Sequence, residues 1–172
     1  MCPSATPGSD PTLTPLAPGA RTSKNEREAA AWFRKAAEQG DPVGQIQIGL
    51  AYYQGRGVGK DKGEAERWYK KASDQGDATG SYLYGLLYLE KPAPGRTDPI
   101  GTHIAVEALQ LSATRGYAVA AFALGDLFSG RIFKYHVTKD ELAACAWYVT
   151  ASSLDTQGGF DAAPPVVADE VR

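Results

Sequence analysis

Few residues in this chain are of types that carry out chemistry. It has two cysteines, Cys2 and Cys145, and two histidines, His103 and His136. A catalytic thiol needs a neighbouring base that lowers its pKa, whereas Cys145 stands among alanines in a helical stretch, which predicts a buried side chain. The histidines have no cluster of cysteines or carboxylates at metal-ligand spacing. The sequence therefore predicts no catalysis, no metal and no other cofactor.

The glycine-rich segment 55–61, GRGVGKD, superficially resembles a phosphate-binding loop. A P-loop requires G-x-x-x-x-G-K-[ST], but residue 54 is Gln and Asp61 follows the lysine. A dinucleotide-binding fingerprint also fails, because Lys60 stands where the third glycine is needed and no strand precedes it. We interpret the segment as a connection between helices.

Composition narrows the class of protein further. The 172 residues include 18 Lys and Arg against 20 Asp and Glu, which gives a net charge of −2. This balance does not favour nucleic-acid binding, which normally requires a basic face. No apolar run approaches the roughly 20 residues of a membrane-spanning helix. The composition favours a protein-binding domain.

The two ends of the chain differ in composition from its middle. Residues 1–22 are rich in Pro, Ser and Thr and lack any helical or strand period, which predicts a disordered arm. Residues 154–172 contain Gly-Gly and Pro-Pro pairs and predict a loose tail or a short segment capping the last helices. The predicted folded domain spans residues 23–153.

Cys2 follows the first methionine and precedes the predicted arm. This arrangement resembles a mature bacterial lipoprotein, in which a lipidated cysteine and a flexible tether hold a domain at a membrane. We expect a lipid-anchored protein of the bacterial periplasm. The alternative is an ordinary second residue on a cytoplasmic protein.

Capping signals divide the middle of the chain into helices. Helix starts are predicted at Asp41, Asp61, Asp77, Asp98 and the capping boxes Ser23-x-x-Glu26 and Thr138-x-x-Glu141. Helix ends are predicted at Gly40, Gly76 and Gly116. The resulting seven helices are 24–39, 42–54, 62–75, 78–89, 99–115, 117–129 and 139–152. No segment alternates with a period of two, so the predicted fold is all-α.

The helices repeat along the sequence. Trp32 and Trp68 are 36 residues apart, as are Gly49 and Gly85. A third copy lacks the tryptophan, and a half copy restores it as Trp147. In the first two copies, one helix face carries Ala29, Trp32, Phe33 and Ala36, and then Ala65, Trp68, Tyr69 and Ala72. We expect these faces to pack between stacked hairpins, with the small residues allowing close approach.

The repeated stretches A-x-x-W-Y-x-K-A-A-E-Q-G and A-x-x-x-L-G-x-x-Y, with the loop 55–61, resemble the Sel1-like repeat family, which is related to tetratricopeptide repeats. The resemblance implies a right-handed α/α solenoid of about three and a half repeats. It also implies an adaptor or scaffold role, or that of a periplasmic immunity protein neutralising a secreted, type VI-like effector such as a phospholipase. The alternative is hydrolysis of a β-lactam or ester, although the regular cysteine pairs of such relatives are absent here.

The first helix of each hairpin is expected to line the concave face of such a solenoid. Its positions outside the repeat motif are the predicted partner-binding residues: Ile46, Leu50, Tyr53, Gln54, Tyr82, Leu86, Leu89, Glu90, Phe122, Asp126 and Ser129. Apolar and tyrosine side chains exposed together are typical of protein interfaces. The same side chains could instead pack against neighbouring helices. The sequence thus predicts a groove that binds another protein of unknown identity.

Overall fold

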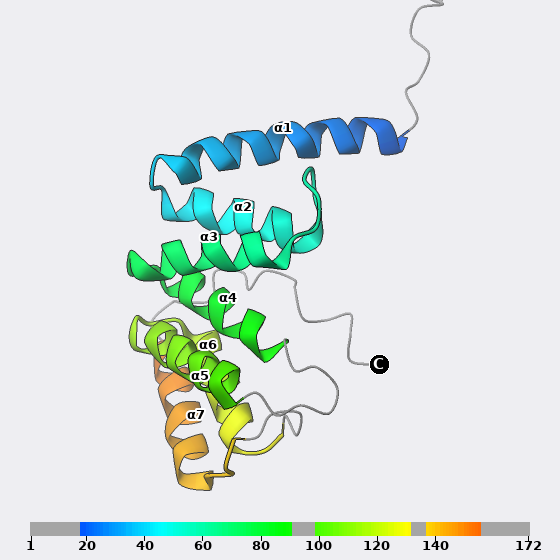
Figure 1. The fold of residues 1–172 in the computed structure, drawn as a ribbon. Coiled ribbons are helices and arrows are strands. Elements are labelled where there is room, and N and C mark those ends of the chain that lie inside the picture. The colour runs from blue at the N-terminus through cyan, green and yellow to red at the C-terminus, as the bar shows by residue number, and fades with distance from the viewer. Residues whose placement is uncertain (1–17, 91–98, 132–136, 156–172) are drawn as a thin grey trace, which may run out of the picture.

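A computed structural model of the chain describes residues 18–90, 99–131 and 137–155, and these residues form an α/α solenoid (Figure 1). The helices are α1 (Pro18–Glu38), α2 (Pro42–Gln54), α3 (Lys62–Asp74), α4 (Ala78–Leu89), α5 (Pro99–Thr114), α6 (Ala118–Phe128) and α7 (Glu141–Asp155). The described ranges contain no strand, which confirms the all-α prediction. Nor does any helix in them combine the length and apolar character needed to cross a bilayer.

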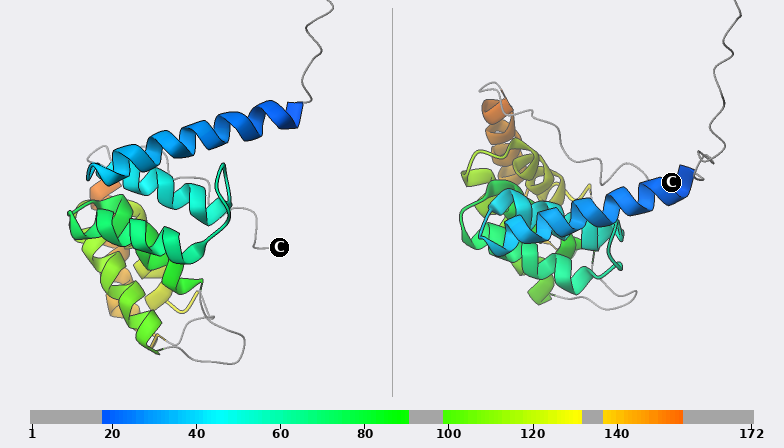
Figure 2. Two further views of the ribbon diagram at one scale, coloured as in Figure 1. Left: turned by 45° about the horizontal axis from the view of Figure 1, so that its top comes forward. Right: turned by 90° about the horizontal axis from the view of Figure 1, so that it is seen from above.

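The order of packing follows the order of the chain. Each helix contacts chiefly the helices before and after it, so the seven elements form a linear stack. Helix α1 lies at one end of the stack and α7 at the other (Figures 1 and 2). We call α2, α4 and α6 the first helices of the three complete hairpins, and α3, α5 and α7 their second helices.

Local capping explains most of the helix boundaries. The carboxylates of Asp41, Asp61 and Asp77 accept hydrogen bonds from backbone N–H groups at 2.9 Å from Gly44, 2.9 Å from Gly63 and 2.7 Å from Gly80. These bonds satisfy donors that a helix start leaves free. At the turns between helices, Gly40, Gly76 and Gly116 have φ of 92°, 93° and 93°, a conformation that favours glycine.

Two predicted capping boxes are wrong. Helix α1 begins at Pro18, so Ser23 lies inside it rather than at its start. Proline suits the first turn of a helix, because its fixed φ is helical and no N–H is lost there. Helix α7 begins at Glu141, and its cap is Asp140 instead of Thr138, with Asp140 accepting a bond of 3.0 Å from the N–H of Ala143.

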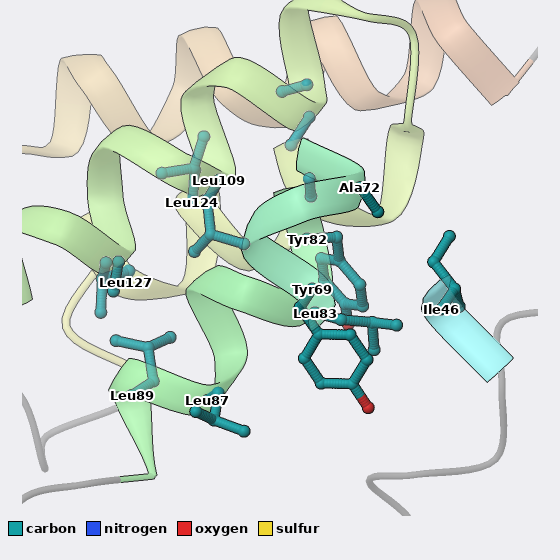
Figure 3. Close-up of a cluster of buried hydrophobic side chains, with 14 of the residues drawn as sticks. Ile46, Tyr69, Ala72, Tyr82, Leu83, Leu87, Leu89, Leu109, Leu124 and Leu127 are labelled. Atoms are coloured by element: carbon teal, nitrogen blue, oxygen red, sulfur yellow. The ribbon is translucent and has the colours of Figure 1, made fainter. Parts of the chain in front are cut away.

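Glycines in the first helices let each hairpin close tightly. A Cβ atom on Gly49 would lie 2.5 Å from the ring of Tyr69, and one on Gly125 would lie 2.6 Å from the ring of Tyr148. Gly85 lies over Leu109 in the same way. In every complete hairpin, therefore, the glycine of the repeat motif makes room for the large side chain of the second helix. Figure 3 shows Tyr69 in the core beside Leu83 and Ile46.

A second set of glycines brings consecutive hairpins together. A Cβ on Gly80 of α4 would lie 2.6 Å from Cβ of Ala72 and 3.0 Å from the backbone nitrogen of Ser73, both on α3. Gly44 of α2 meets Ala36 of α1 in an equivalent way. The predicted role of the small residues, close helix approach, is confirmed at these contacts.

The face that carries the repeated aromatic residues is mostly buried in the second repeat, where Trp68 is half-buried, and mostly exposed in the first. Ala65, Tyr69 and Ala72 are buried in α3, as predicted. On α1, by contrast, Trp32 is 68% exposed and Phe33 is also exposed, so the prediction that they fill a gap between hairpins is wrong. The reason is that no helix among the described residues lies on α1 in the way that α2 lies on α3.

Candidate functional site

The predicted partner-binding residues do not all reach the surface. Ile46, Tyr82 and Leu89 are buried in the core and offer little area to a partner. Leu50 and Leu86 are half-buried and pack against the same core. Tyr53 and Gln54 are half-exposed at the C-terminal end of α2, and Glu90 is exposed at the C-cap of α4.

Tyr53 and Glu90 are joined by a third residue, Lys62. The phenol of Tyr53 donates a hydrogen bond to the carboxylate of Glu90. The Lys62 ammonium lies 2.9 Å from the same carboxylate and 5.4 Å from the centre of the Tyr53 ring. A cation over an aromatic ring and beside a carboxylate is stabilised electrostatically. This Tyr53–Lys62–Glu90 cluster connects the adjoining ends of α2, α3 and α4.

The predicted residues on α6 belong to a different cluster. The phenol of Tyr148 on α7 donates a bond of 2.6 Å to the carboxylate of Asp126 and lies 3.4 Å from the Ser129 hydroxyl. Arg131 pairs with Asp126 at 3.6 Å. Phe122 is exposed, with its ring 6.3 Å from that of Tyr148. The structure thus brings Phe122, Asp126 and Ser129 together with α7 through Tyr148.

Sequence reasoning missed Lys62, Arg131 and Tyr148. Lys62 and Tyr148 lie on second helices, whereas the predicted groove was drawn only from the first helices. One signal for Lys62 was available in the sequence. The predicted cap Asp61 starts a helix at residue 62, which places Lys62 at the same end of the hairpin as Tyr53. The pairing with Glu90 required knowing how α4 lies on α3.

Several tyrosines in and beside these clusters are held in the neutral form. Burial raises the pKa of Tyr69, and the nearby Tyr53 and Glu90 raise it further. Burial, with a smaller contribution from Tyr117, raises the pKa of Tyr82 to about 12 from its ordinary 10.0. The Tyr82 and Tyr117 rings lie 5.1 Å apart.

The pKa of Tyr82 predicts a loss of stability in alkali. Between pH 10 and pH 12 the unfolded chain ionises this phenol while the folded chain does not, so the free energy of unfolding falls as pH rises, by up to about 1.4 kcal/mol per pH unit. Tyr82→Phe removes this contribution. We expect the difference in stability between wild type and Tyr82→Phe, measured by urea unfolding, to change by about 2 kcal/mol from pH 9 to pH 11.5. An unchanged difference would contradict the assignment.

Of the residues considered for chemistry, the structure describes Cys145 on α7 and His103 on α5. Cys145 is exposed, so its predicted burial is wrong. His103 pairs with Glu107 at 3.2 Å, one helical turn away, with both side chains exposed. Cys2 and His136 lie outside the described residues, and the expected lipid anchor stays a prediction. Within the described ranges, no group of His, Cys, Asp and Glu could hold a metal ion.

The glycine-rich loop 55–61 packs against α1. Gly57, with φ of 70°, lies so close to the backbone of Glu26 that a Cβ atom there would overlap its carbonyl group. Gly55 ends α2 in a left-handed conformation. These contacts support the interpretation of the segment as a connection, because the glycines are used for turns and close approach.

Comparison with known families agrees with this geometry. The Sel1 repeat matches residues 16–41, 42–77 and 118–155, which together make up more than half of the chain. The chain belongs to the Sel1 repeat family. Sel1 repeats are generally protein–protein interaction modules, and solenoids of this fold are typically non-enzymatic. The matched segments correspond to α1, to the hairpin α2–α3 and to the hairpin α6–α7.

Solved structures of other Sel1 repeat proteins resemble the solenoid. One is c5321, a protective antigen of uropathogenic Escherichia coli strains with an SLR fold, at a TM-score of 0.65 and 25% identity over 78% of this chain. Another is a Sel1 repeat protein from Oxalobacter formigenes, at a TM-score of 0.64 and 29% identity over 76% of this chain. The alignments cover 27% and 51% of those two chains. No curated protein sequence matches the chain significantly.

Proposed function

We propose that this Sel1 repeat chain binds a partner protein through the Tyr53–Lys62–Glu90 cluster and the half-buried side chains beside it, Leu50, Gln54 and Leu86. The observation that carries the proposal is the cluster itself, in which a half-exposed tyrosine lies between a cation and a carboxylate at the meeting point of three helices. Tyrosine is a frequent anchor of protein interfaces, since it combines apolar area with a polar tip.

The charged members of the cluster suit recognition better than stabilisation. The side chains of Lys62 and Glu90 are 48% and 38% exposed, and exposed ion pairs contribute at most about 1 kcal/mol to folding. Charges placed around an aromatic anchor can instead orient a partner and exclude others. Leu50 and Leu86 pack against the core beneath them and fix the position of this surface.

The finer role that we propose is that of a bacterial envelope adaptor, or of an immunity protein that neutralises a secreted effector. Lipid anchoring through Cys2 in the periplasm belongs to the same proposal. The identity of the bound partner distinguishes the two roles, because an adaptor binds envelope components whereas an immunity protein binds a toxin.

An ion-pair swap separates partner binding from folding. In Lys62→Glu/Glu90→Lys the ion pair is kept, while the charges that a partner meets are reversed and the Tyr53 phenol loses its acceptor at residue 90. A matched control is Lys70→Asp/Asp74→Lys, which swaps another exposed pair, 2.8 Å apart on α3. We expect the first swap to weaken binding of the protein captured by the wild-type chain by about tenfold, or about 1.4 kcal/mol, and the control swap to leave it unchanged.

The measurement is affinity capture from a lysate of the source bacterium, followed by titration of the captured protein against each variant. Equal affinity for the two swapped variants would contradict the proposed surface. The design avoids Tyr53→Glu and Leu86→Glu, because the first places an acid beside Glu90 and the second places one against the core.

A further inference from the structure

Helix α1, at one end of the stack, has the sequence and the contacts of a second helix (Figure 1). An offset of 36 residues aligns it with α3. It meets the helix after it as α3 does, because Gly44 of α2 lies against Ala36 and Gly80 of α4 lies against Ala72. Three further residues of α1 occupy the positions that meet the first helix of a hairpin, and we call them the α1 face: Ala29, Trp32 and Phe33.

The equivalent face is covered in each of the three complete hairpins. Its central residue is Tyr69 on α3, 2% exposed, and Leu109 on α5, 0% exposed, and it is the half-buried Tyr148 on α7. On α1 the same position is Phe33, which is 37% exposed, and its neighbour Trp32 is 68% exposed. Among the described helices, α1 is the one that carries this face uncovered.

The first helices show what kind of helix fits the face. In all three complete hairpins a glycine of the first helix lies against the central residue, namely Gly49, Gly85 and Gly125. Ile46 and Leu50, on the same side of α2 as Gly49, pack in one core cluster with the second helix. A fitting helix therefore carries a small residue flanked by apolar residues three positions before it and one after it.

The α1 face is already arranged to receive such a helix. The Lys35 ammonium lies 5.4 Å from the centre of the Trp32 ring, as the Lys71 ammonium lies 4.1 Å from that of Trp68. Helix α1 is formed and is held on α2 through buried residues such as Ala37. Binding to a surface that is ordered beforehand loses less conformational entropy. Adjacent exposed aromatic side chains are also typical anchors of protein interfaces.

We propose that the α1 face binds an amphipathic helix of a partner protein, which takes the place of a first helix and sets a glycine or alanine against Phe33. A second folded copy of the chain does not offer this helix, because its own glycines at 49, 85 and 125 are already covered. Residues 1–17 do not favour it either, since prolines at 3, 7, 11 and 15 disfavour a helix. The α1 face shares no residue with the Tyr53–Lys62–Glu90 cluster and is a second surface for a partner.

The probe for this surface is a labelled peptide of residues 41–55, the segment that contains α2. Val43→Lys and Gln47→Asp, joined by a lactam bridge, keep the peptide helical before it binds. These two positions are not buried in the protein, so the bridge leaves the side of Gly49 free. We expect this peptide to bind the full chain in a fluorescence anisotropy titration. A bridged peptide with Gly49→Leu is expected to bind at least about tenfold more weakly, although it is more apolar.

Variants of the protein locate the bound peptide. Trp32→Ser/Phe33→Ser is expected to weaken binding by at least about tenfold. The matched control Leu142→Ser/Val149→Ser removes two exposed apolar side chains from α7, at the other end of the stack, and is expected to leave binding unchanged. The swap Lys62→Glu/Glu90→Lys is also expected to leave it unchanged, which separates this surface from the cluster. Circular dichroism checks that each variant is folded.

Three results would overturn the proposal. The first is that the bridged peptide does not bind, or binds as well with Gly49→Leu. The second is equal affinity for the wild type and Trp32→Ser/Phe33→Ser. The third is a dimer of the wild-type chain that Trp32→Ser/Phe33→Ser abolishes in analytical ultracentrifugation, because a second copy would then cover the α1 face.

Discussion

Tyr69→Ala is expected to lower the free energy of unfolding by about 4 kcal/mol, a large share of the stability of a domain of this size. The Tyr69 side chain is 2% exposed and is one of the largest fully buried groups among the described residues. Its ring fills the space above Gly49, so its loss leaves a cavity between α2 and α3 that helix backbones cannot readily close. Unfolding in guanidinium, followed by circular dichroism, measures the effect.

Tyr69→Phe is the matched control, because it keeps the ring and removes only the hydroxyl. We expect this variant to cost no more than about 1.5 kcal/mol. If Tyr69→Ala and Tyr69→Phe were equally stable, the ring would not be the element that joins α2 to α3.

Gly80→Ala is expected to be the second most damaging change, with a cost of about 3 kcal/mol despite the better helix propensity of alanine. The new methyl group would lie 2.6 Å from Cβ of Ala72 and 3.0 Å from the backbone nitrogen of Ser73. Neither atom belongs to a flexible side chain, so α4 must move away from α3. Because α4 also carries Glu90, the change is expected to weaken partner binding through the cluster as well.

Gly59→Ala controls for the substitution itself, since no atom lies within 4 Å of the position where its Cβ would be. We expect its thermal unfolding temperature to be within a few degrees of that of the wild type, which corresponds to a change in the free energy of unfolding on the order of 0.5 kcal/mol. A Gly80→Ala protein as stable as Gly59→Ala would show that α3 and α4 pack less closely than described.

The fold was largely predictable because its signals are local. Aspartate caps, turn glycines and the 36-residue spacing act within a few residues or recur along the chain, so helices 42–54 and 78–89 were predicted with the observed bounds. Burial depends instead on the neighbouring helix. Trp32 and Cys145 show this, because each of them is exposed at an end of the stack, where no neighbouring helix among the described residues covers its repeat position.

The candidate site was less predictable than the fold. A first helix is enclosed on both sides by second helices, so a wider face of it is buried than in a helix at a surface. Ile46, Tyr82 and Leu89 fall on this wider face. Lys62 and Tyr148 were missed for the converse reason, since second helices also reach the surface where their ends meet the first helices.

The linear stack has a consequence for how the protein opens. Because α1 packs chiefly on α2 and on the loop 55–61, and leaves Trp32 in solvent, it can detach without disturbing the helices beyond. The middle of the stack is held differently. Arg115 donates hydrogen bonds to the Ser73 carbonyl at 3.1 Å and to the Ser81 hydroxyl at 2.8 Å, and these bonds tie α3 and α4 to the end of α5.

Amide protons should therefore exchange with solvent fastest at α1 and slowest at the centre of the stack. A partner held between α2, α3 and α4 would slow exchange in those helices and leave α7 unchanged.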